Sequence, residues 1–227
     1  MSEFVGCGKL DTIALTIANI DDSIHKLMKL PKNIHALGLI SSRTGAAGQI
    51  MAADEAVKMT NAKIISIELP RDTKGWGGHG NYIVLGSSTY SDVKQATQIA
   101  LELCDKHAGE VYISEAGHLE FCYTASCGEA INKVFGAPIG AAFGFLAASP
   151  AAIGLLLADK AVKSAAIKPL DLWTPNYGTS HSNEVILPFT GTASDVKNAV
   201  LTARENGLKL LTVMGSYPES PSEPYIL

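Results

Sequence analysis

The chain has 227 residues, of which 47% are hydrophobic, and it carries a formal net charge of −4. This length suits one large domain or two small ones with a buried core. The acidic balance argues against nucleic-acid binding, which needs a basic stripe. No basic segment followed by an apolar run opens the sequence, so no secretory signal is expected.

Hydrophobic periodicity predicts alternating strands and helices along the first half of the chain. Strands are expected at 12–20, 35–42, 63–69 and 81–86, and helices at 22–30, 45–60 and 91–107. Ser91 is the expected N-cap of the last helix, with Asp92 in its first turn, where a negative charge suits the helix dipole.

The second half repeats this pattern. Strands are expected at 111–123, 142–149, 170–173 and 184–190, and helices at 125–136, 150–165 and 194–206, with a further apolar element at 208–215. The proline-rich end, 217–227, is expected to be a loosely held arm. We therefore expect an α+β fold in each half, with helices packed on an antiparallel or mixed sheet.

One uncharged stretch, 134–158, is long enough to cross a bilayer. Its prolines and glycines favour a different interpretation, a buried strand followed by a helix with Ser149 as N-cap and Pro150 as first helical residue. The four cysteines, Cys7, Cys104, Cys122 and Cys127, show no C-x-x-C spacing, and reduced thiols are expected.

Internal repetition is the most informative feature of the sequence. Residues 53–70 (ADEAVKMTNAKIISIELP) align without a gap with residues 158–175 (ADKAVKSAAIKPLDLWTP), and seven of the eighteen positions agree. Downstream, SDVKQA at 91–96 matches SDVKNA at 194–199. The chain is therefore expected to contain two homologous domains, 4–109 and 110–219, followed by a tail at 220–227.

The ordered pair of motifs resembles the shell domain of bacterial microcompartments, in which a helix ending in A-D-x-x-V-K precedes a strand, a pore loop, a strand and a helix. Each half carries an extra strand in front, so the chain is similar to the circularly permuted, tandem-domain members found in propanediol- and ethanol-utilising compartments. The resemblance implies two permuted domains with a ferredoxin-like-related sheet, and a trimer that imitates a hexamer.

The first glycine-rich loop contains a formal G-x-G-x-x-G, but a strand follows it, so a dinucleotide site is disfavoured. An ordinary flexible hairpin is the plain alternative. The resemblance implies a pore loop here, for which glycines permit close approach around an axis. The implied pore residues are Lys74, Gly75, Trp76, Gly77, Gly78, His79 and Gly80.

The second loop is rich in hydroxyl and amide groups, which can replace the water hydrogen bonds of a small polar solute. The resemblance implies a second pore loop with Asn176, Tyr177, Gly178, Thr179, Ser180 and His181. A Ser180–His181 nucleophile is the catalytic alternative, but adjacent side chains seldom face each other and no acid is evident.

Three further polar residues, Glu115, His118 and Glu120, are candidates for lining a channel within each subunit, and their pattern is weak support for metal ligation. Lys58 and Lys163 occupy equivalent places in the repeats, and the resemblance implies that they contact the neighbouring tile. Alone, each is a solvated lysine, supported by the carboxylate four residues earlier.

The sequence thus predicts a structural shell protein and no enzyme. Homotrimers would form flat tiles that meet other shell proteins edge to edge, surround enzymes of alcohol or diol metabolism, and pass small polar metabolites. The expected location is a bacterial microcompartment in the cytoplasm, with no cofactor, metal, nucleic acid or membrane. The alternatives are an enzyme that uses the glycine-rich loop and a trimeric ligand-sensing regulator.

Overall fold

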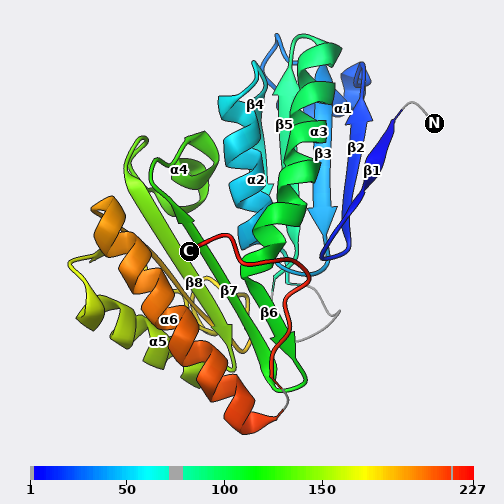
Figure 1. Ribbon diagram of the computed structural model, residues 1–227. Coiled ribbons are helices and arrows are strands. Elements are labelled where there is room, and N and C mark those ends of the chain that lie inside the picture. The colour runs from blue at the N-terminus through cyan, green and yellow to red at the C-terminus, as the bar shows by residue number, and fades with distance from the viewer. Residues whose placement is uncertain (1–2, 72–78, 216) are drawn as a thin grey trace.

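The computed structural model describes residues 3–71, 79–215 and 217–227, and it contains two α+β domains (Figure 1). Domain 1 comprises β1 (Phe4–Gly8), β2 (Thr12–Ile17), α1 (Asp22–Leu27), β3 (Ala36–Ser42), α2 (Ala47–Lys58), β4 (Lys63–Glu68), β5 (Asn81–Ser87) and α3 (Tyr90–His107). Domain 2 follows a short 3-10 turn, η1 (Ala108–Glu110), and comprises β6 (Val111–Ser114), β7 (Gly117–Thr124), α4 (Glu129–Phe135), β8 (Ala142–Ser149), α5 (Ala151–Ser164), β9 (Lys168–Pro169), β10 (Val185–Gly191) and α6 (Ala193–Met214).

The two sheets have the same topology. Their strand orders are β1-β2-β3-β5-β4 and β6-β7-β8-β10-β9, and all of the strand pairs in the described residues are antiparallel. Helices α2 and α3 cover one face of the first sheet, and α5 and α6 cover the corresponding face of the second (Figure 1). The predicted α+β class, the antiparallel sheet and the tandem repeat are therefore confirmed.

One hydrophobic core is shared by the two domains. It joins α2 residues such as Ile50 and Met51 to domain 2 residues such as Ile131, Phe143 and Phe145. A second core lies between the sheet of domain 2 and its helices, and a small one lies beneath α1. Apolar burial of this extent stabilises the relative placement of the domains as well as each domain.

Several element boundaries differ from the sequence-based expectation. The expected strand at 111–123 is a hairpin, because the chain turns at residues 115 and 116 between β6 and β7. The first strand of this hairpin, β6, corresponds to β1 in domain 1, and the sequence pattern did not reveal β1. The expected strand at 170–173 is shorter and earlier, β9, and the expected separate element at 208–215 is the continuation of α6.

The expected helix starts were also wrong in detail. Thr89, not Ser91, is the N-cap of α3, although Asp92 does lie in its first turn. Ser149 is the last residue of β8, and Pro150 is the N-cap of α5. The strand-then-helix interpretation of the uncharged stretch is confirmed, and none of the helices in the described ranges has the length and apolar character needed to cross a membrane.

The C-terminal tail is an ordered part of the fold, which corrects the expectation of a loose arm. Glu219 exchanges two backbone hydrogen bonds with Ile113, of 2.8 and 2.9 Å. The Lys9 ammonium of domain 1 donates to the Pro221 carbonyl at 2.6 Å, and the Ile226 side chain is 2% exposed. The tail therefore runs along β6 to the boundary between the domains (Figure 1).

All four cysteines are free thiols, as expected, with Cys7 exposed and Cys104, Cys122 and Cys127 buried. Burial raises the pKa of Cys104 to about 12 and raises the pKa of the Cys122 thiol as well. Protonated, buried thiols are poor nucleophiles, so these two behave as small apolar core residues.

Candidate functional site

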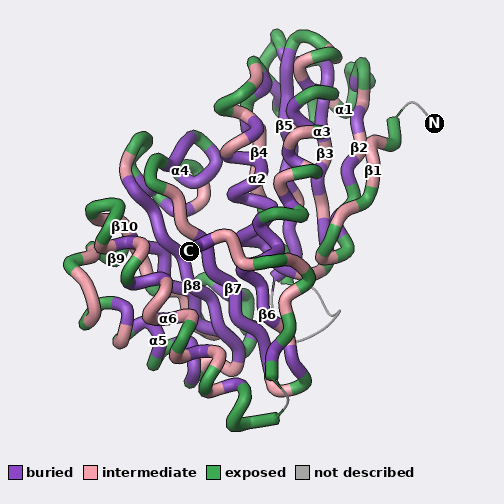
Figure 2. The backbone as a smooth tube through the Cα atoms, viewed as in Figure 1, coloured by how far each residue is buried: buried purple, intermediate pink, exposed green. Residues whose placement is uncertain are grey.

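Several buried ionisable side chains lie where the two domains meet. Helix α2 of domain 1 lies against α4 and β7 of domain 2, and this boundary, here called the domain junction, is largely buried (Figures 1 and 2). Buried polar groups require hydrogen-bond or charge partners, so the contacts at the junction can be followed group by group.

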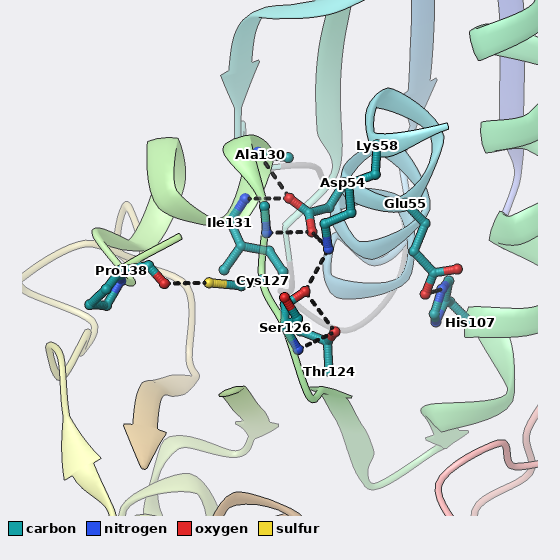
Figure 3. A network of polar contacts seen from close by, with 11 residues as sticks. Asp54, Glu55, Lys58, His107, Thr124, Ser126, Cys127, Ala130, Ile131 and Pro138 are labelled. Atoms are coloured by element: carbon teal, nitrogen blue, oxygen red, sulfur yellow. Dashed lines mark hydrogen bonds and ion pairs between the residues drawn. The ribbon is translucent and has the colours of Figure 1, made fainter. Parts of the chain in front are cut away.

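Asp54 on α2 binds the beginning of α4 in the other domain (Figure 3). Its Oδ2 accepts from the Gly128 N–H at 2.8 Å, and its Oδ1 accepts from the Ala130 and Ile131 N–H groups at 3.0 and 3.3 Å. These N–H groups have no partner within their own helix, and the helix dipole favours a negative charge there. A side chain that is 0% exposed thereby has its charge compensated.

Lys58 completes this network from one turn further along α2. Its ammonium lies 2.7 Å from Asp54 Oδ2 and donates to the Ser126 carbonyl at 2.6 Å, as Figure 3 shows. The expected i,i+4 ion pair is confirmed. The ammonium thus contacts domain 2 of the same chain, while the side chain remains 36% exposed.

Glu120 makes the reciprocal contact from domain 2 to domain 1. Its Oε2 accepts from the Ala46 and Ala47 N–H groups, both at 3.2 Å, at the beginning of α2. Each domain therefore places a buried carboxylate at the N-terminus of a helix in the other domain. The paired arrangement fixes the relative orientation of the domains more specifically than apolar packing does.

Two buried histidines and a second glutamate lie beside Glu120. Glu184, just before β10, contacts the His79 ring through Oε1 and lies 3.2 Å from His118 Nε2 through Oε2. His118 Nε2 also lies 3.9 Å from Glu120 Oε1. We call His79, His118, Glu120 and Glu184 the junction cluster, and each is at most 5% exposed.

The pKa values of His118 and Glu184 move in the direction that favours charge pairing. Burial alone would lower the pKa of His118, but the adjacent Glu184 and Glu120 carboxylates outweigh burial and raise it. Burial alone would raise the pKa of Glu184, but His118 and His79 beside it hold it below its usual value. The pair of Glu184 and His118 therefore favours its charged form.

A small cavity of about 10 Å³ adjoins the cluster and is lined by His79, Glu120, Glu184 and apolar side chains. A space of this size holds at most one water molecule. Within the described ranges, no group of three or more histidine, cysteine, aspartate and glutamate side chains is arranged to hold a metal ion.

The sequence-predicted pore residues have different positions in the structure. Lys74, Gly75, Trp76, Gly77 and Gly78 lie outside the described residues. His79 is 3% exposed and belongs to the junction cluster, and Gly80 approaches the Ser42 carbonyl so closely that no side chain fits there. His79 therefore acts at the domain junction in this structure and does not line an open surface.

The second predicted loop is compact. Thr174 pairs with Tyr177 through two backbone hydrogen bonds, and the buried Thr179 hydroxyl donates to the Thr174 carbonyl at 3.0 Å. Asn176, Tyr177, Gly178, Ser180 and His181 are exposed. Among the described residues, no contact joins the Ser180 hydroxyl to the His181 ring or to an acid, so the loop does not form a nucleophilic site.

The remaining candidates separate into buried and exposed groups. His118 and Glu120 lie in the junction cluster, whereas Glu115 is exposed at the turn between β6 and β7. Lys163 is 72% exposed and pairs only with Asp159, at 2.7 Å, among the described contacts. Sequence reasoning did not identify Glu184 as a partner of His118, because the two residues meet only after β7 and β10 have folded around β8.

Comparison with known proteins identifies the class. The family model for the BMC domain matches residues 36–116 and 142–220. The chain therefore belongs to the BMC-domain family of bacterial microcompartment shell proteins. The prediction of a tandem shell protein rather than an enzyme is confirmed, as is its place in the microcompartment shell.

Particular relatives match the whole chain. The microcompartment shell protein PduB of Citrobacter freundii is 48% identical over 226 residues, which cover 100% of this chain and 84% of the relative. The crystal structure of EtuB from Clostridium kluyveri is 46% identical with a TM-score of 0.95, over 99% of this chain and 98% of that one. A trimeric shell protein PduB is 42% identical with a TM-score of 0.94, over 99% and 100% of the two chains.

Proposed function

We propose that three copies of this chain close into a ring of six similar domains, and that this disc is a tile of the shell. The observation that carries the proposal is the unequal burial of two equivalent helix faces. Ile50 and Met51 on α2 are each 1% exposed, because domain 2 covers them. Leu155 and Leu156, at the same places on α5 in the ungapped repeat, are 54% and 41% exposed.

The complementary face, which α4 forms in domain 2, is exposed on α1 of domain 1. Ile131 of α4, which packs at the domain junction, is 0% exposed, whereas its repeat equivalent on α1, Ile24, is 45% exposed. Leu27 on the same short helix is 77% exposed. Inside the chain, faces of α2 and α4 pack together. Each chain therefore exposes the repeat equivalents of these two faces, on α5 and on α1.

Two different complementary faces on one chain give a heterologous contact, which closes into a ring when the rotation between copies allows it. Exposed apolar patches of this kind mark interaction surfaces in soluble proteins. If the contact between chains repeats the contact within a chain, three chains place six domains around one axis. The likeness to a trimeric shell protein PduB over the whole chain supports this closure.

The proposed disc would leave openings where loops meet. Residues 74–78 of the first loop and the exposed residues of the loop at 176–181 are the proposed linings. Small polar metabolites of alcohol or diol metabolism are the proposed solutes, with the enzymes of that metabolism enclosed. Lys163, which is exposed, is a proposed contact residue at the tile edge together with Lys58. Their location near the ends of α5 and α2 supports a role at boundaries between domains or tiles.

Introducing a charge into the free face of α5 should prevent ring closure. We expect Leu156→Glu to convert the trimer to single chains, because the carboxylate would be buried without a partner at the interface. Native mass spectrometry measures the result directly. The matched control is Val213→Glu, at a position on α6 that is 85% exposed and outside the proposed interface, and it should leave the trimer intact. A Leu156→Glu chain that remains fully trimeric would contradict the proposal.

A further inference from the structure

The junction cluster places four ionisable side chains in the buried boundary between the two domains. We propose that this cluster is a pH-responsive contact, which holds the two domains of one chain together in mildly acidic solution and weakens as the solution becomes neutral to alkaline. This contact lies within a single chain and does not depend on trimer formation.

The ionisable side chains of the cluster come from three segments of the chain. His79 comes from the segment before β5 of domain 1, Glu184 from the segment before β10, and His118 and Glu120 from β7. Glu120 also accepts hydrogen bonds from the N-terminus of α2, and burial together with the charge of Glu120 raises the pKa of the Cys122 thiol on β7. His79, Glu184, His118 and Glu120 therefore form a continuous series of contacts that ends at the N-terminus of α2.

His118 has the central position in this series. Glu184 binds domain 1 through His79, and Glu120 binds domain 1 through the first N–H groups of α2. His118 lies between the two carboxylates, at 3.2 and 3.9 Å. When His118 loses its proton, two buried carboxylates face each other without the intervening positive charge, and both of the contacts that cross the junction weaken.

The pKa shifts of His118 and Glu184 give the direction of the pH dependence. A histidine whose pKa is raised in the folded chain, from its usual 6.5, contributes stability below about pH 6.5 and loses it as pH rises through the folded value. A glutamate with a lowered pKa, from its usual 4.5, contributes above that value and loses its contribution in more acidic solution. The contact is therefore strongest between about pH 4.5 and 6.5 and weakens on the alkaline side.

The response should be confined to the junction within the chain. The domain 1 equivalent of Glu120 is Ile13, since these two residues pair with Ala147 and Ser41, which hold the same place in β8 and β3. An isoleucine cannot titrate. A contact between chains that repeats this junction therefore lacks the carboxylate that Glu120 supplies within the chain. Alkaline solution should then loosen the two domains of a chain before it separates neighbouring chains.

Hydrogen exchange on the full-length chain tests the proposal at the amides that form the contact. Between pH 6 and pH 8.5, corrected for the intrinsic effect of pH on exchange, we expect protection of the Ala46 and Ala47 amides to fall, about tenfold for each unit by which the pKa of His118 exceeds 6.5. The variant His118→Gln should show lower protection at pH 6 and little further change up to pH 8.5. The control His35→Gln, at an exposed position, should behave as the unsubstituted chain does.

Equal pH dependence of protection in the His118→Gln chain and the unsubstituted chain would overturn the proposal. If the variant does not fold, NMR titration of the His118 ring in the unsubstituted chain decides the question. A midpoint above 6.5 together with a matching loss of protection at Ala46 supports the contact, and a midpoint at or below 6.5 refutes it.

Discussion

Replacing Asp54 by alanine is expected to lower the free energy of unfolding by about 3–5 kcal/mol, the usual cost of removing one partner from a buried charged network. The substitution leaves three N–H groups of α4 without an acceptor and leaves the Lys58 ammonium without its carboxylate. Urea unfolding at a fixed protein concentration measures the change, since association would otherwise shift the apparent stability.

The matched control is Glu102→Ala, at an exposed carboxylate on α3, where a change within about 0.5 kcal/mol is expected. The account of the domain junction requires a large difference between the two variants. Similar losses in both would show that Asp54 does not connect the domains in the way its contacts indicate.

The substitution Arg204→Met should have an effect of similar size at the tail. Arg204 Nη1 contacts both carboxylate oxygens of Glu110, at 2.9 and 3.0 Å, and donates to the Ile226 carbonyl at 2.9 Å. Glu110 is 0% exposed, so its charge would lose its main partner inside the protein. We expect a loss of about 3–5 kcal/mol in the free energy of unfolding, and exposure of the tail to proteolysis.

Lys209→Met is the appropriate comparison for Arg204→Met, because it removes an ion pair on the same helix whose two members, Lys209 and Glu205, are 71% and 68% exposed. No measurable change is expected there, since exposed pairs contribute little. A tail that stays resistant to protease after Arg204→Met would mean that the apolar contacts of Ile226 suffice to hold it.

The sequence predicted the repeating fold well because that information is local. The alternation of apolar residues and the shared ADxAVK segment define α2 and α5 without any knowledge of distant contacts. The same local argument failed at helix starts. Ser91 follows the true N-cap, Thr89, and several hydroxyl-bearing residues in that stretch are equally plausible caps by type.

The junction was not predictable in the same way, since its contacts join residues far apart in the chain. The bonds of Asp54 to Gly128 and of Ala46 to Glu120 each span 74 positions. From sequence, Asp54 shows only its i,i+4 relation to Lys58, and His79 appears to belong with its glycine-rich neighbours. Their buried partners become evident only once β5, β7 and β10 are in place.

The tail illustrates how composition can mislead. Its prolines lack N–H donors, which favoured a loose arm. The residues between them supply the missing bonds, since Glu219 pairs with Ile113, the Ser220 hydroxyl donates to Ala108, and Ile226 donates to Glu110. A segment with few donors is ordered when those few meet buried acceptors.

Cross-linking between α1 and α5 tests most directly whether contacts between chains repeat the contact within the chain. In the chain, the Ile131 N–H donates to Asp54, and the repeat equivalents of these residues are Ile24 and Asp159. A Cys7→Ser chain carrying Ile24→Cys and Asp159→Cys, treated with a short thiol cross-linker, should yield covalent species of up to three times the 23.9 kDa chain mass. Products that extend beyond three chains, or the absence of any link between chains, would contradict the closed ring of six domains.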